Sequence, residues 1–178
     1  MNEYIKEVLF SEEAIRLRVE ELGAKITSDY AGKDILLIGV LKGCYVFLAD
    51  LARRIELDCE IRFITASSYG KGVISSGDVR IGMDFDFEIE NRDVLIVEDI
   101  LDSGITLTVL QGFISKRNPA SLRICTLLDK PARRRAEIEP DYTGFECPDE
   151  FVVGYGLDYA ERYRNLPFVA VLKPEAYS

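Results

Sequence analysis

The sequence has no histidine, and its four cysteines lie far apart, at Cys44, Cys59, Cys125 and Cys147. Structural zinc sites usually combine cysteine and histidine ligands at short spacings, and the chain has no CxxC pair. We therefore expect neither a structural zinc site nor disulfide bonds. Without histidine, proton transfer in any reaction must depend on another side chain, such as a carboxylate.

Long hydrophobic runs are also missing. No apolar run approaches the roughly 18 to 20 residues that span a bilayer. The first residues, Met1-Asn2-Glu3, are acidic rather than basic, unlike the start of a secretory signal. We expect a cytoplasmic protein with no membrane partner.

Positive charge is scarce, because 22 Lys and Arg residues stand against 31 Asp and Glu residues, a net charge of -9. Binding to nucleic acid normally depends on a basic surface, so no nucleic-acid partner is expected. An acidic protein should also repel a polyphosphate unless cations compensate. Magnesium is the simplest candidate, because it combines a few carboxylates with substrate phosphates.

The 178 residues are 48% apolar, which is enough for one packed core, so we expect a single domain over residues 1–178. Apolar runs of strand type alternate with helical patterns. The expected strands are 34–40, 59–66, 94–97, 121–128, 151–155 and 168–172, and the expected helices are 11–30, 45–54 and 106–115. Residues 79–87 could add an antiparallel excursion. This alternation predicts an α/β fold with a largely parallel central sheet, whose ligand lies beyond the strand ends.

The most informative stretch is VLIVEDILDSGIT, residues 94–106. Its apolar strand delivers two adjacent carboxylates, Glu98 and Asp99, and the following turn opens a helix. The turn alone could be an ordinary cap by Asp102 or Ser103. Two carboxylates ending a buried strand are costly unless they have a function. Because free N–H groups at a helix start attract phosphate, we expect a site for a phosphorylated sugar.

This stretch resembles the phosphoribosyl-diphosphate signature of the type I phosphoribosyltransferases, and within them the chain resembles the hypoxanthine-guanine phosphoribosyltransferases. The motifs that carry the resemblance, in order, are LLIGVLKGCYVF, SSYG, VLIVEDILDSGIT, LLDKPARR and FVVGYGLDYAERYRNLP. The resemblance implies a parallel sheet flanked by helices, a small hood formed by the N- and C-terminal segments, and a flexible lid at about 67–78. It also implies a homodimer or homotetramer.

The resemblance assigns the phosphoribosyl donor to the central motif. Glu98 and Asp99 would bind the ribose hydroxyls, directly or through magnesium, and Asp102 would be the general acid/base facing the purine imidazole nitrogen. The 5-phosphate would be held by the turn and helix start, formed by Asp102, Ser103, Gly104, Ile105 and Thr106. Gly104 permits close approach of the backbone, which suits this role.

The diphosphate would lie against the turn Leu41-Lys42-Gly43, which in the family often contains a non-proline cis peptide. Arg164 would contact the same group, and Ser68 and Tyr69 belong to the lid. Taken alone, Lys42 could be a solvated lysine in a simple turn and Arg164 part of a solvated surface helix. The lid could equally be a surface loop.

For the purine, the resemblance implies that Lys130 contacts the exocyclic oxygen of a 6-oxopurine, that Phe151 stacks on the base, and that the Val152 backbone reads its edge. Asp158, at a strand end, is counted with the purine-binding residues and would hold a second magnesium with the diphosphate. By composition alone Lys130 would be a surface lysine, and Phe151 and Val152 a core strand. A cationic donor favours an oxygen over the amino group of adenine.

The resulting hypothesis is displacement at the anomeric carbon of phosphoribosyl diphosphate by hypoxanthine or guanine. Three alternatives remain open. One is transfer to another base, such as xanthine or a pyrimidine. Another is a regulatory protein that senses nucleotides and binds RNA or DNA, which the acidic composition disfavours. The third is a flavodoxin-like signalling domain, which would leave Lys42, Lys130 and Arg164 without a role.

Overall fold

The structure, a computed structural model, describes residues 3–68, 79–82 and 87–177. Within these residues, six strands form the main sheet in the order β4-β3-β2-β5-β6-β7. Neighbours from β3 to β7 pair in parallel, and β4 pairs antiparallel with β3 at one edge. The strands are β2 (Ile35–Leu41), β3 (Cys59–Ser68), β4 (Val79–Gly82), β5 (Asp93–Leu101), β6 (Ser121–Asp129) and β7 (Tyr142–Glu146). The predicted parallel α/β sheet is confirmed.

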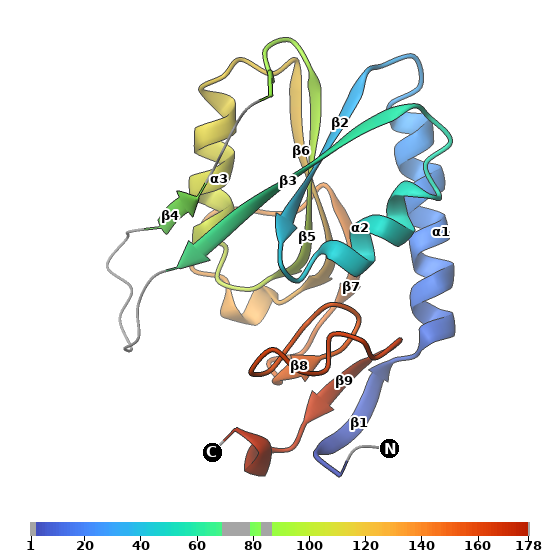
Figure 1. Ribbon diagram of the computed structural model, residues 1–178, viewed down its shortest axis with the longest axis vertical. Coiled ribbons are helices and arrows are strands. Elements are labelled where there is room, and N and C mark those ends of the chain that lie inside the picture. Colours follow the sequence, from blue (N-terminus) through green and yellow to red (C-terminus); the bar gives the residue numbers. More distant parts are fainter. Residues whose placement is uncertain (1–2, 69–78, 83–86, 178) are drawn as a thin grey trace.

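Helices cover both faces of this sheet (Figure 1). α1 (Glu12–Asp29) and α2 (Tyr45–Ala52) pack on one face, and α3 (Ile105–Ser115) packs on the other. Alternate residues of the central strands enter the two cores, so that Leu95 joins the α1 and α2 side while Ile96 joins the α3 side. These strands are therefore buried on both faces, which explains their continuous apolar sequences.

The predicted start of the first helix is confirmed. Ser11 is the N-cap of α1, and its hydroxyl accepts a hydrogen bond from the Ala14 N–H at 3.2 Å. The buried stripe of this helix follows the helical period and consists of Ile15, Val19, Leu22, Gly23 and Ile26. One face of α1 therefore packs on the sheet and the other meets solvent.

Segments from the two ends of the chain form a second, antiparallel sheet. Among the described residues, its three antiparallel strands are ordered β1-β9-β8 and comprise β1 (Ile5–Phe10), β8 (Val152–Val153) and β9 (Val169–Leu172). The segments 151–155 and 168–172 therefore do not extend the parallel sheet, as their alternation with helices had suggested. The second sheet lies beyond the carboxyl ends of β2 and β5 (Figure 1) and combines N- and C-terminal segments, as expected for a hood.

The central strand is longer than its sequence predicted. The expectation was an end at Val97, but β5 continues to Leu101 and stays paired with β6 up to the partner Asp129. Glu98 and Asp99 consequently lie inside the strand rather than after it. Backbone pairing with β6 overrides the break in the apolar pattern, so the strand carries the two carboxylates to the edge of the core.

Candidate active site

Two loops at the carboxyl edge of the main sheet enclose a cavity of about 250 Å³. One loop joins β2 to α2 and the other joins β5 to α3. The lining residues are Val40, Leu41, Lys42, Gly43, Glu98, Asp99, Ile100, Leu101, Asp102, Ser103, Gly104, Thr106 and Leu107. The structure thus brings together most of the side chains predicted to bind the ribose, the 5-phosphate and the diphosphate. Ile105, the first residue of α3, does not line this cavity, and its backbone N–H donates a hydrogen bond of 3.4 Å to Ser103 Oγ.

Glu98, which is half-buried, and Asp99, which is buried, form an acidic pair at this cavity. Asp99 is only 9% exposed, and its carboxylate accepts a hydrogen bond from the Ile100 N–H at 2.8 Å. Burial, followed by the neighbouring Asp99 charge, raises the pKa of Glu98 well above its ordinary value. Burial also raises the pKa of Asp99. Among the described side chains, no lysine or arginine forms an ion pair with either carboxylate.

This unpaired acidic pair suits a bound cation. Among the described residues, no group of three or more Cys, His, Asp or Glu side chains forms a metal cluster, and Asp158 is not brought to this pair. A site with two carboxylates and open space fits magnesium, which completes its octahedron with water and substrate phosphates. Glu98 and Asp99 therefore fit the magnesium ion that the sequence predicts. Asp158 does not join them at this site.

The turn after β2 is shaped around Asp99. The peptide bond between Leu41 and Lys42 is cis. A Cβ atom at Gly43 would lie 1.6 Å from Asp99 Oδ2, so a side chain at this position would displace the carboxylate. Gly156 approaches the same turn from the loop after β8, because its own Cβ would lie 2.1 Å from the Gly43 carbonyl oxygen. These two glycines allow three segments of backbone to converge on the cavity.

The turn after β5 leaves the start of α3 open. Gly104 is the N-cap residue with a φ of 81°, and it makes no side-chain cap. The first turn of α3 contains no acidic residue, and Thr106 lines the cavity. The Ser103 hydroxyl accepts a long hydrogen bond of 3.4 Å from the Ile105 N–H, so the cap by Ser103 that the sequence left open is present in a weak form. The first turn of α3 still presents further N–H groups and the positive end of the helix dipole to an anion.

A second pocket of about 470 Å³ adjoins the first at Asp102, which lines both. Its walls are Ile100, Asp102, Lys130, Arg133, Asp149, Glu150, Phe151, Val152, Leu157 and Tyr177. The predicted purine residues Lys130, Phe151 and Val152 therefore lie together, whereas Asp158 lines neither pocket. A carboxylate at the junction of two pockets is placed to exchange a proton between their occupants.

Lys130 is a buried residue in the wall of this second pocket. It is only 6% exposed, and its ammonium group donates a hydrogen bond of 2.6 Å to the carbonyl oxygen of Glu150. It is therefore not the surface lysine that composition alone favoured. Phe151 stacks on Tyr177 with ring centroids 4.8 Å apart and remains 38% exposed. The pocket thus combines aromatic surface with a buried cation.

Six lining residues of this pocket were not predicted, among them Arg133, Asp149 and Tyr177. Arg133 places its Nε 3.0 Å from Asp102 Oδ1 and its Nη1 3.2 Å from Asp149 Oδ1. Tyr177 arrives from the end of the chain, after β9. The doubled arginine in LLDKPARR was a usable signal for Arg133, whereas Asp149 and Tyr177 have none in the sequence, because folding alone brings their segments to the pocket.

The remaining predicted residues lie near the mouth of the first cavity or outside the described residues. Arg164 pairs with Asp158, its Nη2 lying 2.9 Å from Oδ1, and Lys42 pairs with Glu161 at 3.1 Å. The hydrogen bond from Lys42 lowers the pKa of Glu161. Ser68 is the last residue of β3, and Tyr69 with the rest of the expected lid to residue 78 lies outside the described residues.

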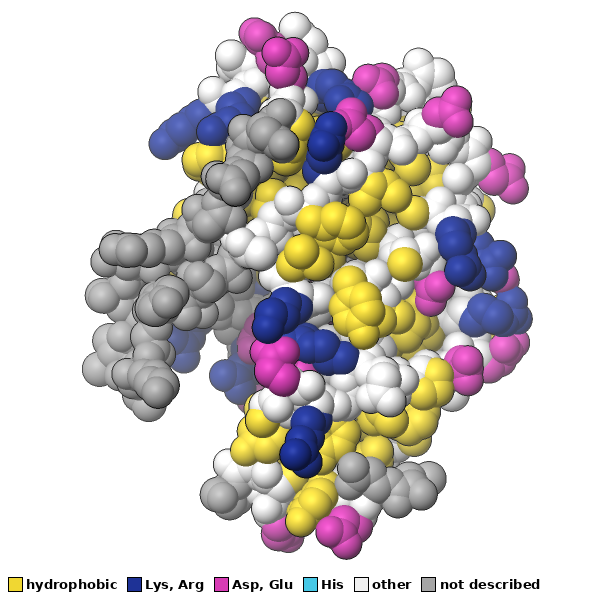
Figure 2. All heavy atoms as spheres, viewed as in Figure 1, with side chains coloured by type: hydrophobic (Ala, Val, Ile, Leu, Met, Phe, Trp, Pro, Cys, Tyr) yellow, Lys and Arg dark blue, Asp and Glu magenta, His cyan; other side chains and the backbone are white. Residues whose placement is uncertain are grey.

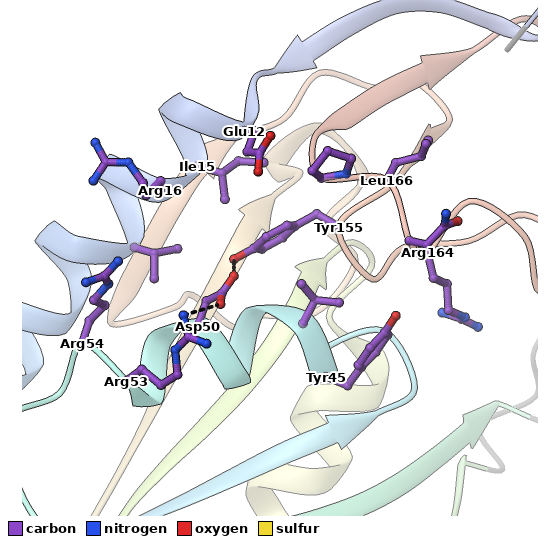
Figure 3. Close-up of a pocket in the computed structure, with 14 residues that line it drawn as sticks. Glu12, Ile15, Arg16, Tyr45, Asp50, Arg53, Arg54, Tyr155, Arg164 and Leu166 are labelled. Carbon is purple, nitrogen blue, oxygen red and sulfur yellow. Dashed lines mark hydrogen bonds and ion pairs between the residues drawn. The ribbon is translucent and has the colours of Figure 1, made fainter. Parts of the chain in front are cut away.

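A further cavity of about 360 Å³ lies between α1, α2 and residues 164–167 (Figure 3). Its polar groups are largely engaged with one another, since Asp50 accepts a hydrogen bond from the Tyr155 hydroxyl at 2.7 Å and also pairs with Arg53. Arg54 pairs with Glu20 at 3.1 Å. Figure 3 shows the Arg164 guanidinium pointing away from Asp50. This cavity therefore offers no unpaired cluster for chemistry.

Among the described residues, the face of the molecule shown in Figure 2 has no extended basic patch. On the face shown in Figure 2, basic side chains lie in small groups beside acidic ones. In the part of the chain that the structure describes, no helix is both long and apolar enough to cross a membrane. The two pockets at the sheet edge remain the strongest candidates for a functional site.

Residues 7–160 match the family model described as a phosphoribosyl transferase domain. The chain belongs to the phosphoribosyltransferase family. Among its relatives, the hypoxanthine-guanine phosphoribosyltransferase of Bacillus subtilis strain 168 is 54% identical over 177 residues, covering 99% of this chain and 98% of the relative. The protein named bifunctional TilS/HprT of Listeria monocytogenes serotype 4b is 52% identical over all 178 residues, but the chain spans only 28% of its length.

Solved phosphoribosyltransferase structures agree with this assignment. A crystal structure of a hypoxanthine phosphoribosyltransferase from Staphylococcus aureus, in a tetragonal space group, superposes with a TM-score of 0.95 at 52% identity. The match covers 98% of this chain and 95% of that one. The fold and the order of motifs are therefore those of the hypoxanthine phosphoribosyltransferases within the family.

Proposed function

We propose that this phosphoribosyltransferase transfers the 5-phosphoribosyl group from phosphoribosyl diphosphate to hypoxanthine or guanine, giving IMP or GMP and diphosphate. This is a reaction of purine salvage. The single observation that carries the proposal is the position of Asp102, which lines both the cavity at the start of α3 and the pocket built on Lys130 and Phe151. One occupant of each pocket would meet at this carboxylate.

The first cavity would hold the donor. The N–H groups at the start of α3 and the hydroxyls of Ser103 and Thr106 would bind the 5-phosphate, with close backbone approach at Gly104. Glu98 and Asp99 would accept hydrogen bonds from the ribose hydroxyls. The turn from Leu41 to Gly43 would face the diphosphate, and Lys42 and Arg164 would supply positive charge to it. Ser68 and Tyr69 of the lid would close over the same group and exclude water.

The second pocket would hold the acceptor. Lys130 would donate to the exocyclic oxygen of a 6-oxopurine, Phe151 would stack on the ring, and the Val152 backbone would read its edge. Asp158, which follows β8, would lie at the edge of this site. A cationic donor meets the amino group of adenine as donor to donor, so the pocket favours oxopurines.

The chemical step would need no covalent enzyme intermediate. The two pockets would orient a purine ring nitrogen toward the anomeric carbon, which supplies much of the rate gain through positioning. Asp102 would take the proton from the imidazole ring as the new bond forms. Magnesium, held by Glu98 and Asp99 and with a second ion near Asp158, would neutralise charge on the departing diphosphate.

The wider setting is part of the proposal. We place the protein in the cytoplasm, because its four cysteines are all free, as is usual in a reducing compartment. We also propose that the chain acts as one domain and assembles as a homodimer or homotetramer. Its partners would be small-molecule substrates rather than nucleic acid or membrane.

The test is a panel of acceptors. The protein is incubated with magnesium, phosphoribosyl diphosphate and one of hypoxanthine, guanine, xanthine, adenine or uracil, and nucleotide is measured by chromatography. We expect IMP and GMP, with adenine and uracil at least about a hundredfold poorer. No nucleotide with any purine would end the enzyme proposal, and a preference for uracil would replace the purine assignment.

A further inference from the structure

Glu161 lies between the two cations proposed to bind diphosphate. Its Oε1 is 3.1 Å from Lys42 Nζ, and its Oε2 is 3.4 Å from Arg164 Nη2. Lys42 belongs to the turn after β2, whereas Glu161 and Arg164 belong to the loop after β8. One carboxylate thus joins cations from two loops that meet at the mouth of the first cavity.

The loop around Glu161 holds this carboxylate in place. Its N–H donates a hydrogen bond of 2.9 Å to Asp158 Oδ2, and the backbone has positive φ values of 51° at Ala160 and 63° at Glu161. Tyr159 and Arg162 close the turn with backbone hydrogen bonds of 3.2 and 3.0 Å. The position of Glu161 therefore follows from a defined turn rather than from a freely moving segment.

Arg164 is directed toward this turn. Its guanidinium donates to the Gly156 carbonyl oxygen at 2.8 Å and pairs with Asp158, and in Figure 3 it points away from the neighbouring cavity. Its Nε is buried without a hydrogen-bond partner among the described residues. The guanidinium of Arg164 therefore has donor capacity left.

The contacts of Glu161 are also exchangeable. The side chains of Lys42 and Glu161 are 68% and 65% exposed, so water competes with their ion pair. Exposed pairs of this kind contribute little to stability. An anion with several charges, such as diphosphate, can replace a single carboxylate on both cations.

We propose that Glu161 is a resident counter-anion that competes with diphosphate for Lys42 and Arg164. This inference rests on the proposed function, because it takes these cations as the diphosphate site. In the free protein Glu161 pairs with both cations, Arg164 being paired with Asp158 as well, and lowers their affinity for phosphate-containing anions. After transfer it returns to them as diphosphate leaves, which limits inhibition by this product.

The experiment compares Glu161→Gln with the control Glu137→Gln. Glu137 is exposed and has no ion pair among the described residues, and both changes remove one negative charge. The dissociation constant of inorganic diphosphate with magnesium is measured by calorimetry, and KM values are measured for phosphoribosyl diphosphate and hypoxanthine. Thermal unfolding checks that both variants fold.

In Glu161→Gln we expect diphosphate to bind about three- to tenfold more tightly, KM for phosphoribosyl diphosphate to fall in parallel, and KM for hypoxanthine to change less than about twofold. The control Glu137→Gln should leave the diphosphate affinity and both KM values unchanged. Adding Lys42→Met to Glu161→Gln should abolish the gain in diphosphate affinity. Unchanged or weaker diphosphate binding in Glu161→Gln overturns the inference. If that variant does not fold, Glu161→Asp must show the same direction.

The two proposals fail in different ways. Diphosphate affinity is measured without purine or turnover, so competition by Glu161 can be observed even if the protein forms no nucleotide. A wild-type protein that makes IMP, but whose Glu161→Gln variant binds diphosphate no more tightly, disproves the role of Glu161 alone. A wild-type protein that binds no diphosphate disproves both.

Discussion

The carboxylate of Asp99 occupies the space that a side chain at Gly43 would need. An added Cβ at residue 43 would come within 1.6 Å of Asp99 Oδ2, far below any contact distance. The turn proposed to bind diphosphate and the acidic pair proposed to bind ribose and magnesium are therefore fitted to each other. Glycine at position 43 is a requirement of the site rather than of the turn alone.

Gly43→Ala should therefore damage binding more than folding. Because the new methyl group must push Asp99 or the turn aside, we expect kcat/KM for phosphoribosyl diphosphate to fall by about a hundredfold. The control is Gly112→Ala on α3, where an added Cβ meets nothing within 4 Å. That change should keep full activity and raise stability by about 0.5–1 kcal/mol. Steady-state kinetics measure the activity of the two variants, and chemical denaturation measures their stability. Equal activity in the two variants would contradict the fit between Gly43 and Asp99.

Asp102→Asn should separate chemistry from binding. An amide keeps the shape of the carboxylate but cannot accept the purine proton, so kcat should fall about 10²- to 10⁴-fold. Affinity for phosphoribosyl diphosphate, measured by calorimetry, should change less than about threefold. Asp149→Asn is the matched control, because it removes the other carboxylate paired with Arg133. Asp149→Asn should lower kcat far less than Asp102→Asn. Unchanged turnover in Asp102→Asn would show that Asp102 is not the general acid/base.

Glu98→Gln should stabilise the protein while inactivating it. Burial raises the pKa of Glu98 above its ordinary value of 4.5, so the folded state binds the proton more tightly than the unfolded state. Unfolding then releases a proton, and the stability of the wild type falls as pH rises from about 4.5 through the raised pKa. The amide escapes this cost, so with chelator at pH 7.5 we expect a gain of about 1 kcal/mol, or about 2–4 °C in Tm.

The pH dependence supplies the control for this prediction. Near pH 4 the wild-type carboxyl group is mostly protonated in both states, so Glu98→Gln should show a much smaller gain there. Magnesium with phosphoribosyl diphosphate should raise the Tm of the wild type more than that of the variant. A gain in Tm that is equal at pH 4 and pH 7.5 would mean that the Glu98 charge is not its source.

Lys130→Met should affect the acceptor and spare the donor. Methionine has a similar length but cannot donate to an exocyclic oxygen, so KM for hypoxanthine should rise at least about tenfold, with KM for phosphoribosyl diphosphate within about threefold. Leaving the Glu150 carbonyl without its donor should also cost about 1–3 kcal/mol of stability. Steady-state kinetics with each substrate varied in turn measure the two KM values. An equal rise in KM for hypoxanthine and for phosphoribosyl diphosphate would contradict the prediction.

The central strands and their motifs could be predicted from the sequence for a physical reason. β2, β5 and β6 are buried on both faces, so each gives a continuous apolar run, and the polar residues directly after or within those runs mark the carboxyl edge. Ser11 could be predicted as a cap because a local hydrogen bond defines it. These features depend on neighbours in the chain.

Two strands, β1 and β7, could not be predicted in the same way. β1 has irregular register against β9, with shifts between Ile5 and Glu7 and between Val8 and Phe10, so its side chains do not alternate cleanly. β7 contains Gly144, whose Cβ would lie 2.4 Å from the Leu127 carbonyl oxygen, and glycine weakens a strand pattern. Both elements, like the contact of Lys42 with Glu161, depend on residues far apart in the chain.

The most direct test of the central claim is the stoichiometry of the reaction. Wild-type protein is mixed with magnesium, phosphoribosyl diphosphate and hypoxanthine, and IMP, diphosphate and ribose 5-phosphate are quantified together over time. The adjoining pockets at Asp102 predict equal amounts of IMP and diphosphate, with almost no ribose 5-phosphate. Diphosphate released with ribose 5-phosphate in place of IMP, or no consumption of either substrate, would contradict the account.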